Sequence, residues 1–438
     1  MHEHDPPLGK PPTPDDPDKG GRPDRRGAFR LLFFALAVIG AGNTMLIAAV
    51  LPPLTRELAL PDWMAGAIFS LSAAVWVVMS PFWGTRSNSW GRRRVAALGL
   101  AGYAVSMLLF GTVGQLALSG AIAGPLVIFG CLLASRSLFG LFGSGTNPAA
   151  QAYVADRTSP ERRTEEIASV TAGHSFGTVA GPAFAAAVAG IAGLLSPAFL
   201  TAAMAAVAAY LILTRLPEDS PPKESALRPS PKLINPLWWD TRILPFVLFS
   251  VSLSLVTGVI FQTFAFAIMD KLDVGGTEVN QFTGPAYSVG AMATLLAQLV
   301  LIPRLNLSNR NLMVAGAACI CVGALAIIPT RDFAVLIMAQ FAIGMGQGLS
   351  RPGFFSGASL AVGPEEQGDV AGVMVATNAI GFVVSPLFGP YVYEFVSREA
   401  PFLMAAGLLA IMAVYAQFAV KDTPEATAQP GKPDIAPD

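Results

Sequence analysis

The sequence is poor in the residues from which disulfides, metal sites and enzyme active sites are built. Among its 438 residues there are three cysteines and three histidines. Cys131, Cys319 and Cys321 all fall within long apolar runs, so we expect neither a disulfide framework nor a cysteine-based metal site. No Gly-rich loop ending in Lys and Ser or Thr is present, and no nucleophile is paired with a base. These absences argue against ATP-driven chemistry and against an enzyme, and we expect no cofactor.

Charge is also scarce, and apolar residues take its place. Only 13% of the residues are charged, 53% are hydrophobic, and the mean hydropathy is +0.55. A bilayer core about 30 Å thick is spanned by about 20 apolar residues per helix. We therefore predict an all-α integral membrane protein with twelve transmembrane helices. The predicted spans are 29–54, 62–83, 94–113, 124–152, 164–193, 195–214, 241–269, 276–303, 310–329, 333–361, 367–394 and 400–420.

The basic residues are unevenly distributed between the two ends of these spans. Most of the 28 lysines and arginines fall in the two tails and the even-numbered connections. The other side holds only Arg56, Lys271, Arg331 and Arg398. By the positive-inside rule both termini are predicted to be cytoplasmic, and we expect a multi-pass protein of a bacterial inner membrane. The net charge of −1 averages basic and acidic regions, so it gives no argument for a nucleic-acid partner.

Polar segments divide the chain into five parts. Residues 1–28 and 421–438 are expected to be disordered cytoplasmic tails, because they are rich in proline and poor in apolar residues. Residues 215–240 hold a cluster of prolines with mixed charges and are predicted to be a cytoplasmic linker. The remaining parts, 29–214 and 241–420, are predicted to form one six-helix bundle each. The first apolar run is too long for a signal-peptide core, so we interpret it as a retained helix.

The two predicted bundles share an internal repeat. The segment from Arg136 to Pro182 matches Gln340 to Pro386 without a gap, 204 residues later, and the match falls on residues that shape helices, such as Gly140 and Gly344. Two halves built to one plan, with the same even number of helices, are typical of transporters whose substrate site lies between the halves. The connection after span 2 matches that after span 8 at an offset of 218. We therefore expect a longer outer loop near 111–125.

The connection after span 2 carries a recognisable motif. Residues 84–93 read Gly-Thr-Arg-Ser-Asn-Ser-Trp-Gly-Arg-Arg, which resembles the Gly-x-x-x-Asp-Arg-x-Gly-Arg-Arg signature of the major facilitator superfamily. The acid of that signature is Asn88 here, and its first arginine is Ser89. The resemblance implies that Arg92 pairs with Asp156 at the inner end of span 4, although the basic residues also serve as a topology signal. The residues in register are Gly84, Gly91, Arg92 and Arg93.

Spans 4 and 5 extend the resemblance. Arg136 to Gly140 resembles the Arg-x-x-x-Gly pattern of helix 4 in the same superfamily. Residues 173–182 resemble the Gly-x-x-x-Gly-Pro motif of helix 5, which in that superfamily is found in exporters that run as antiporters. Small residues at this spacing also serve helix packing alone. The motif positions in span 5 are Gly173, Gly177, Gly181 and Pro182.

Polar residues near mid-membrane are candidates for the transport path, because they rarely face lipid. Arg136 and His174 lie at similar depth on spans 4 and 5, and their repeat mates are Gln340 and Asn378. We hypothesise that these four side chains border the path, although each could also serve only to hold helices together by hydrogen bonds. Arg351 could attract an anionic substrate or extend to the headgroups. Further candidates are Asn43, Gln262, Tyr287 and Gln347.

Every aspartate and glutamate falls at a span end or outside the spans. His174 is then the deep group whose ordinary pKa of about 6.5 lies near neutrality, so we assign proton coupling to it, with Arg136 modulating its charge. The resemblance implies a monomeric twelve-helix exporter of small amphipathic molecules or drugs, an antiporter driven by the proton gradient through alternating access. Two alternatives remain open. One is a symporter or facilitator that imports a small metabolite or organic anion, and the other is a non-transporting receptor or scaffold.

Overall fold

The fold was analysed in a computed structural model, which describes residues 25–159, 162–217, 236–305, 307–363 and 366–420. The predicted tails therefore lie outside the described residues except for 25–28. Of the predicted linker, only 215–217 and 236–240 are described.

Regular structure in the described residues is helical throughout, and twelve helical stretches are long and apolar enough to cross a membrane. The prediction of twelve spans is confirmed, with boundaries that agree to within several residues. The helices are α1 (Arg25–Met45), η1 (Leu46–Val50), α2 (Leu51–Glu57), α3 (Asp62–Trp90), α4 (Arg92–Leu118), α5 (Pro125–Leu138), η2 (Phe139–Gly143), α6 (Thr146–Ala155), α7 (Arg163–Ala192), α8 (Ser196–Arg215), η3 (Pro236–Trp239), α9 (Leu244–Leu272), α10 (Val279–Leu296), η4 (Ala297–Leu301), α11 (Ile302–Leu305), α12 (Asn309–Ile327), α13 (Phe333–Leu360), α14 (Gln367–Phe395) and α15 (Ala400–Ala419).

Three of the spans contain a π-helical turn. The turns η1, η2 and η4 join α1 to α2, α5 to α6 and α10 to α11, respectively. A π turn widens the helix by one residue and shifts the side chains that follow onto another face. Beyond η1 lie Pro52 and Pro53, which have no backbone N–H to donate to the preceding turn.

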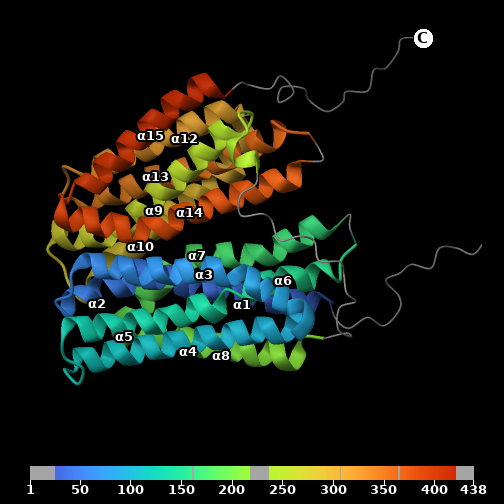
Figure 1. The fold of residues 1–438 in the computed structure, drawn as a ribbon. Coiled ribbons are helices and arrows are strands. Elements are labelled where there is room, and N and C mark those ends of the chain that lie inside the picture. Colours follow the sequence, from blue (N-terminus) through green and yellow to red (C-terminus); the bar gives the residue numbers. More distant parts are fainter. Residues whose placement is uncertain (1–24, 160–161, 218–235, 306, 364–365, 421–438) are drawn as a thin grey trace, which may run out of the picture.

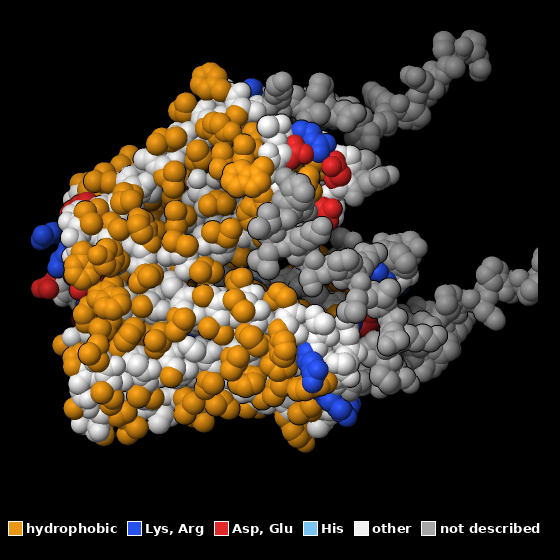
Figure 2. All heavy atoms as spheres, in the orientation of Figure 1, with side chains coloured by type: hydrophobic (Ala, Val, Ile, Leu, Met, Phe, Trp, Pro, Cys, Tyr) orange, Lys and Arg blue, Asp and Glu red, His pale blue; other side chains and the backbone are white. Residues whose placement is uncertain are grey.

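The helices form two groups, α1–α8 and α9–α15 (Figure 1). The start of α1, the end of α8, the start of α9 and the end of α15 lie at the same end of the bundle (Figure 1). We call this the linker end and the opposite one the distal end. Apolar side chains cover the visible flank between the two ends, and the charged side chains visible there gather near the ends (Figure 2).

Small residues bring helices together inside each group. Gly173, Gly177 and Gly181 of α7 lie against the α1 backbone, and a Cβ built on Gly177 would overlap the carbonyl oxygen of Ala37. Because no side chain separates the helices there, their backbones pack directly against each other.

The repeat mates of these glycines also lie at a helix contact. Thr377, Gly381 and Ser385 of α14 face α9, where Thr377 Oγ1 lies 2.9 Å from Ser250 Oγ. The second half therefore keeps one close backbone contact, at Gly381, and has hydroxyl side chains where the first half has Gly173 and Gly181.

Two local predictions were wrong. The motif at 84–93 is not a loop, because α3 continues as a helix to Trp90 and only Gly91, with a φ of 92°, connects it to α4. A φ in this region is readily adopted by glycine. The extra residues of the first half do not form a longer outer loop either. They lengthen the helices, since α4 has 27 residues and α12 has 19, whereas the connections 119–124 and 328–332 are similar.

Candidate functional site

Arg136 is fully buried near the middle of the span formed by α5, η2 and α6. Its Nη2 donates a hydrogen bond of 2.8 Å to Oδ1 of Asn43 on α1. The guanidinium carbon lies 5.2 Å from the ring centroid of Phe69 and 4.7 Å from that of Phe139. Nε and Nη1 have no hydrogen-bond partner among the described residues. The positive charge is thus held by an amide and two aromatic rings, with no carboxylate beside it.

The second half has a neutral counterpart of this arrangement. Gln340, the repeat mate of Arg136, is 5% exposed, and its Nε2 has no partner among the described residues. Ser72 donates to the carbonyl of Arg136, and Gly290, which lies 218 residues after Ser72, packs against the carbonyl of Gln340. The aromatic counterpart of Phe69 is Tyr287. The backbone arrangement is therefore repeated, whereas the charge is not.

Two further predicted residues are buried in the second half. The hydroxyl of Tyr287 donates a hydrogen bond of 2.8 Å to the carbonyl of Phe261 on α9, and its ring lies against those of Phe261 and Phe264. Gln262, the next residue of α9, is 5% exposed. Both lie inside the packed helices rather than on an open surface.

His174 lies on a stripe of α7 that passes from a buried to an exposed environment. Pro182, Thr178 and His174 are spaced by four residues, so they share one face of the helix. Pro182 is buried against α10 at Gly284, whereas Thr178 and His174 are exposed. The two groups of helices therefore separate between Pro182 and Thr178.

His174 and Arg136 both contact α1, one turn apart. A Cβ built on Gly40 of α1 would overlap the carbonyl oxygen of His174, and Gly40 lies one turn before Asn43, the partner of Arg136. No described hydrogen bond or ion pair joins the two side chains. In this conformation Arg136 is enclosed and His174 is open. Asn378, the repeat mate of His174, is half-buried on α14.

Three predicted residues lie along one face of α13. Gln340, Gln347 and Arg351 are spaced by seven and four residues, and exposure rises from buried Gln340 through half-buried Gln347 to exposed Arg351. Flanking residues of α13 contact α10 at Gly344 and α9 at Phe354. The face that carries Arg351 therefore points between α9 and α10.

Arg351 does not face outward from the bundle. Met338, which is 61% exposed, lies thirteen residues earlier and hence about 140° away around the helix. This direction disfavours the interpretation that Arg351 extends to the headgroups.

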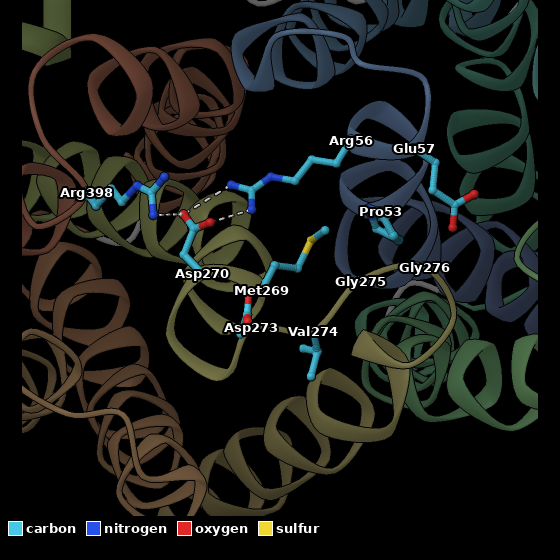
Figure 3. Close-up of a pocket in the computed structure, with 10 residues that line it drawn as sticks. All are labelled: Pro53, Arg56, Glu57, Met269, Asp270, Asp273, Val274, Gly275, Gly276 and Arg398. Carbon is cyan, nitrogen blue, oxygen red and sulfur yellow. Dashed lines mark hydrogen bonds and ion pairs between the residues drawn. The ribbon is translucent and has the colours of Figure 1, made fainter.

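The two halves are tied at the distal end by an ion-pair network that the sequence did not reveal. Asp270 of α9 accepts hydrogen bonds from Arg56 Nη1 at 2.6 Å and from Arg56 Nη2 at 3.2 Å, across the boundary between the halves (Figure 3). Arg56 also pairs with Asp62, and Asp270 further accepts from Tyr393 at 2.6 Å and pairs with Arg398 at 3.3 Å. The only hint in the sequence was that Arg56 and Arg398 are two of the few basic residues predicted on that side of the membrane.

The network borders a pocket of about 550 Å³ at the distal end. The pocket is lined by polar and apolar residues of both halves (Figure 3). They are Pro53, Arg56, Glu57, Met269, Asp270, Asp273, Val274, Gly275, Gly276 and Arg398.

Two equivalent close contacts at glycines also join the halves. Gly66 of α3 packs against the carbonyl of Pro386 on α14, and Gly284 of α10 packs against Ala186 and Pro182 of α7. The glycines are 218 residues apart and the prolines 204, so the two contacts are equivalents of the repeat. The main contacts between the halves, α3 with α14 and α7 with α10, thus lie toward the distal end, and the groups diverge toward the linker end (Figure 1).

At the linker end the motif residues hold helices of the first half together. Arg92 Nε lies 3.2 Å from Asp156 Oδ2 and its Nη1 donates to Ser87, while Arg93 Nη1 donates to the carbonyl of Leu216 at 3.3 Å. Gly84 lies beside α6, and Asn88 is exposed.

The edge of the linker is fixed to the second half. Arg242 pairs with Asp240 at 2.7 Å and with Glu366 at 3.1 Å. The hydrogen bonds from Arg242 hold the pKa of the Asp240 carboxyl below its usual value.

A twelve-helix membrane protein with two repeated halves, joined at one end and separated at the other, has the architecture of a membrane transporter. A family model described as Major Facilitator Superfamily matches residues 32–379 and 279–435. The chain belongs to this superfamily, and it is a multi-pass integral membrane transporter rather than an enzyme.

Individual relatives cover most of the chain. Multidrug resistance protein 2 of Bacillus subtilis (strain 168) is 26% identical over 392 residues, which are 86% of this chain and 90% of that protein. Quinolone resistance protein NorA of Staphylococcus aureus (strain COL) is 22% identical over 384 residues, covering 86% and 92%. A crystal structure of a bacterial homologue of the human lysosomal transporter Spinster, in an inward-facing and occupied conformation, has a TM-score of 0.72 at 16% identity and covers 94% of this chain and 100% of that one.

Proposed function

We propose that this transporter exports small amphipathic molecules in exchange for protons. The observation that carries the proposal is the exposed stripe of α7, where Thr178 and His174 face the space between the halves at the linker end. The stripe belongs to the helix whose Gly-x-x-x-Gly-Pro motif resembles that of exporters. The two relatives carry drug-resistance names, which supports export of drug-like compounds.

The uneven distribution of basic residues supports placing the linker end in the cytoplasm of a bacterial cell. The described conformation is then open to the cytoplasm and closed at the distal end by the Arg56–Asp270 network. Export requires the distal contacts to part and the linker end to close, which two rigid six-helix bundles achieve by rocking about their interface. Each monomer contains both halves, so we propose that it works alone.

We assign proton coupling to His174. Among the described residues, no aspartate or glutamate lies in the middle of a span, whereas His174 is exposed at the point where the halves separate. An imidazole is able to gain and lose a proton near neutral pH. Arg136 contacts α1, the helix that His174 also contacts, and its positive charge disfavours protonation of the His174 imidazole.

The test is transport by purified protein in proteoliposomes, driven either by a pH gradient or by the substrate gradient alone. We expect His174→Ala to lose pH-driven accumulation and to keep downhill transport. Ser175→Ala, a change at the neighbouring exposed residue, should keep both. Undiminished pH-driven transport by His174→Ala would exclude this residue as the coupling group.

The second candidate function is import of a small organic anion, and the exposed guanidinium of Arg351 in the linker-end half of α13 favours it. The same proteoliposome assay determines the direction of substrate transport. Import predicts that a proton gradient directed inward drives uptake of the substrate, whereas antiport predicts that this gradient drives its expulsion.

A further inference from the structure

The charges inside the spans are of one sign. Among the described residues the acids lie at helix ends: Asp270 is two residues from the end of α9, and Glu166 and Asp369 belong to the first turns of α7 and α14. Groups able to carry positive charge lie deeper, at Arg136, His174 and Arg351. A solute that enters between the halves therefore meets a positive potential, which low-dielectric walls strengthen.

Of the two arginines that lie inside the spans, Arg351 is the one that such a solute can reach in the described conformation. It is exposed, and it makes no hydrogen bond or ion pair with any described residue. It lies nine residues before the end of α13 at Leu360, hence about 14 Å from the linker end of the helix. Arg136 is fully enclosed, so it is out of reach in this state.

Among the described residues, Arg351 has an amide side chain one turn away and no acidic partner. Gln347 lies one turn away on the same face of α13 and is half-buried. The repeat mate of Arg351 is Asn147, whose Oδ1 accepts a 3.1 Å hydrogen bond from Gln151 on the same helix. A guanidinium that pairs with no described acid and has an amide one turn away is suited to a carboxylate, which it binds through two parallel hydrogen bonds.

We infer that the molecules this transporter exports carry an anionic group, a carboxylate or a chemical equivalent, which Arg351 binds in the space that opens at the linker end. Arg351 is then the residue that selects the substrate class, and Gln347 provides a further amide donor one turn deeper. This inference rests on the proposed export function. It assigns anionic or zwitterionic amphiphiles to the site and disfavours simple lipophilic cations.

The probes are three dansyl compounds with the same eight-carbon chain that end in a carboxylate, a neutral amide or an amine. Binding to detergent-purified protein is measured by dansyl fluorescence, and transport is measured in proteoliposomes under a pH gradient. We expect the carboxylate to bind at least about tenfold more tightly than the amine, because a hydrogen bond to a charged group has this strength. Arg351→Gln should weaken carboxylate binding by about tenfold to a hundredfold and leave amide binding within about twofold.

Two variants control for folding and for general electrostatics. Arg351→Lys keeps the charge but loses the two-pronged geometry, so carboxylate binding should fall only in part. Arg94→Gln removes one exposed positive charge at the linker end, and it should leave all three affinities unchanged. Equal or tighter binding of the amine, or an unchanged carboxylate affinity in Arg351→Gln, would overturn the inference. Binding of the carboxylate without pH-driven movement of any probe would support the inference and refute the proposed proton-driven export.

Discussion

The distal ion pair between Arg56 and Asp270 predicts that one substitution opens the distal end. Asp270→Asn keeps the shape of the side chain and removes its charge, so the two short hydrogen bonds from Arg56 lose their ionic character. Tyr393 and Arg398 belong to the same half as Asp270, so their contacts do not hold the halves together. The substitution therefore weakens the tie across the halves with little change inside either half.

The size of the effect follows from the contacts. A hydrogen bond to a charged group contributes about 1.5–3 kcal/mol, and we take this value for the whole pair because Arg56 is partly exposed and keeps its second partner, Asp62. This free energy corresponds to a change of about tenfold to a hundredfold in the ratio of distal-closed to distal-open molecules. A ratio of about 99:1 would fall to between about 10:1 and 1:1.

Double electron–electron resonance between two spin labels measures the ratio of distal-closed to distal-open molecules. The labels are placed at Ser119 and Pro329, in the distal connections of the two halves, after the three cysteines have been replaced. We expect Asp270→Asn to add a population with a longer distance between the labels. Asp273→Asn is the matched control, because Asp273 lines the same pocket without a described ion pair and its positive φ suits asparagine. Unchanged distances in Asp270→Asn, or an equal change in the control, would refute the reasoning.

Two further predictions concern close backbone contacts and the buried arginine. Gly66→Ala should weaken the distal closure more than Gly284→Ala. The new Cβ at position 66 overlaps the rigid backbone carbonyl of Pro386, whereas the one at position 284 meets the methyl group of Ala186 at 2.5 Å. The same pair of spin labels measures both effects. Asn43→Ala should lower the free energy of unfolding by about 1–3 kcal/mol, since it removes the described hydrogen-bond acceptor of buried Arg136, and thermal unfolding in detergent measures the loss. An unchanged melting temperature for Asn43→Ala would mean that Arg136 is satisfied in another way.

Much of the fold could be predicted from the sequence, because the bilayer imposes span length and the repeat imposes the relation between halves. The two repeat offsets, 204 and 218, already identify Pro386 as the equivalent of Pro182 and Gly284 as the equivalent of Gly66. The π turns η1, η2 and η4 were not predictable, since a one-residue register shift leaves the apolar composition of a helix unchanged.

The candidate site was less predictable than the fold. Depth along a helix can be counted from the sequence, which is why Arg136 and His174 were placed at similar levels. Exposure depends instead on neighbours that are distant in the chain. Phe69 and Asn43 contact Arg136, whereas the separation of α7 from α10 exposes His174. The distal network was missed for a related reason, because an ion pair across two bundles depends on how the bundles are placed.

The repeat also explains where this transporter is free to vary. At Gly66 and Gly284 any side chain would collide with the opposite half, so both copies of the repeat retain glycine under the same packing constraint. Arg351 is exposed and its mate Asn147 is half-buried, so these positions are less confined than the two glycines. Charge can therefore differ between the halves at such positions without disturbing the frame. A symmetric pivot is thereby compatible with a pathway in which Arg136 and Arg351 each have a neutral repeat mate, so that neither charge is repeated.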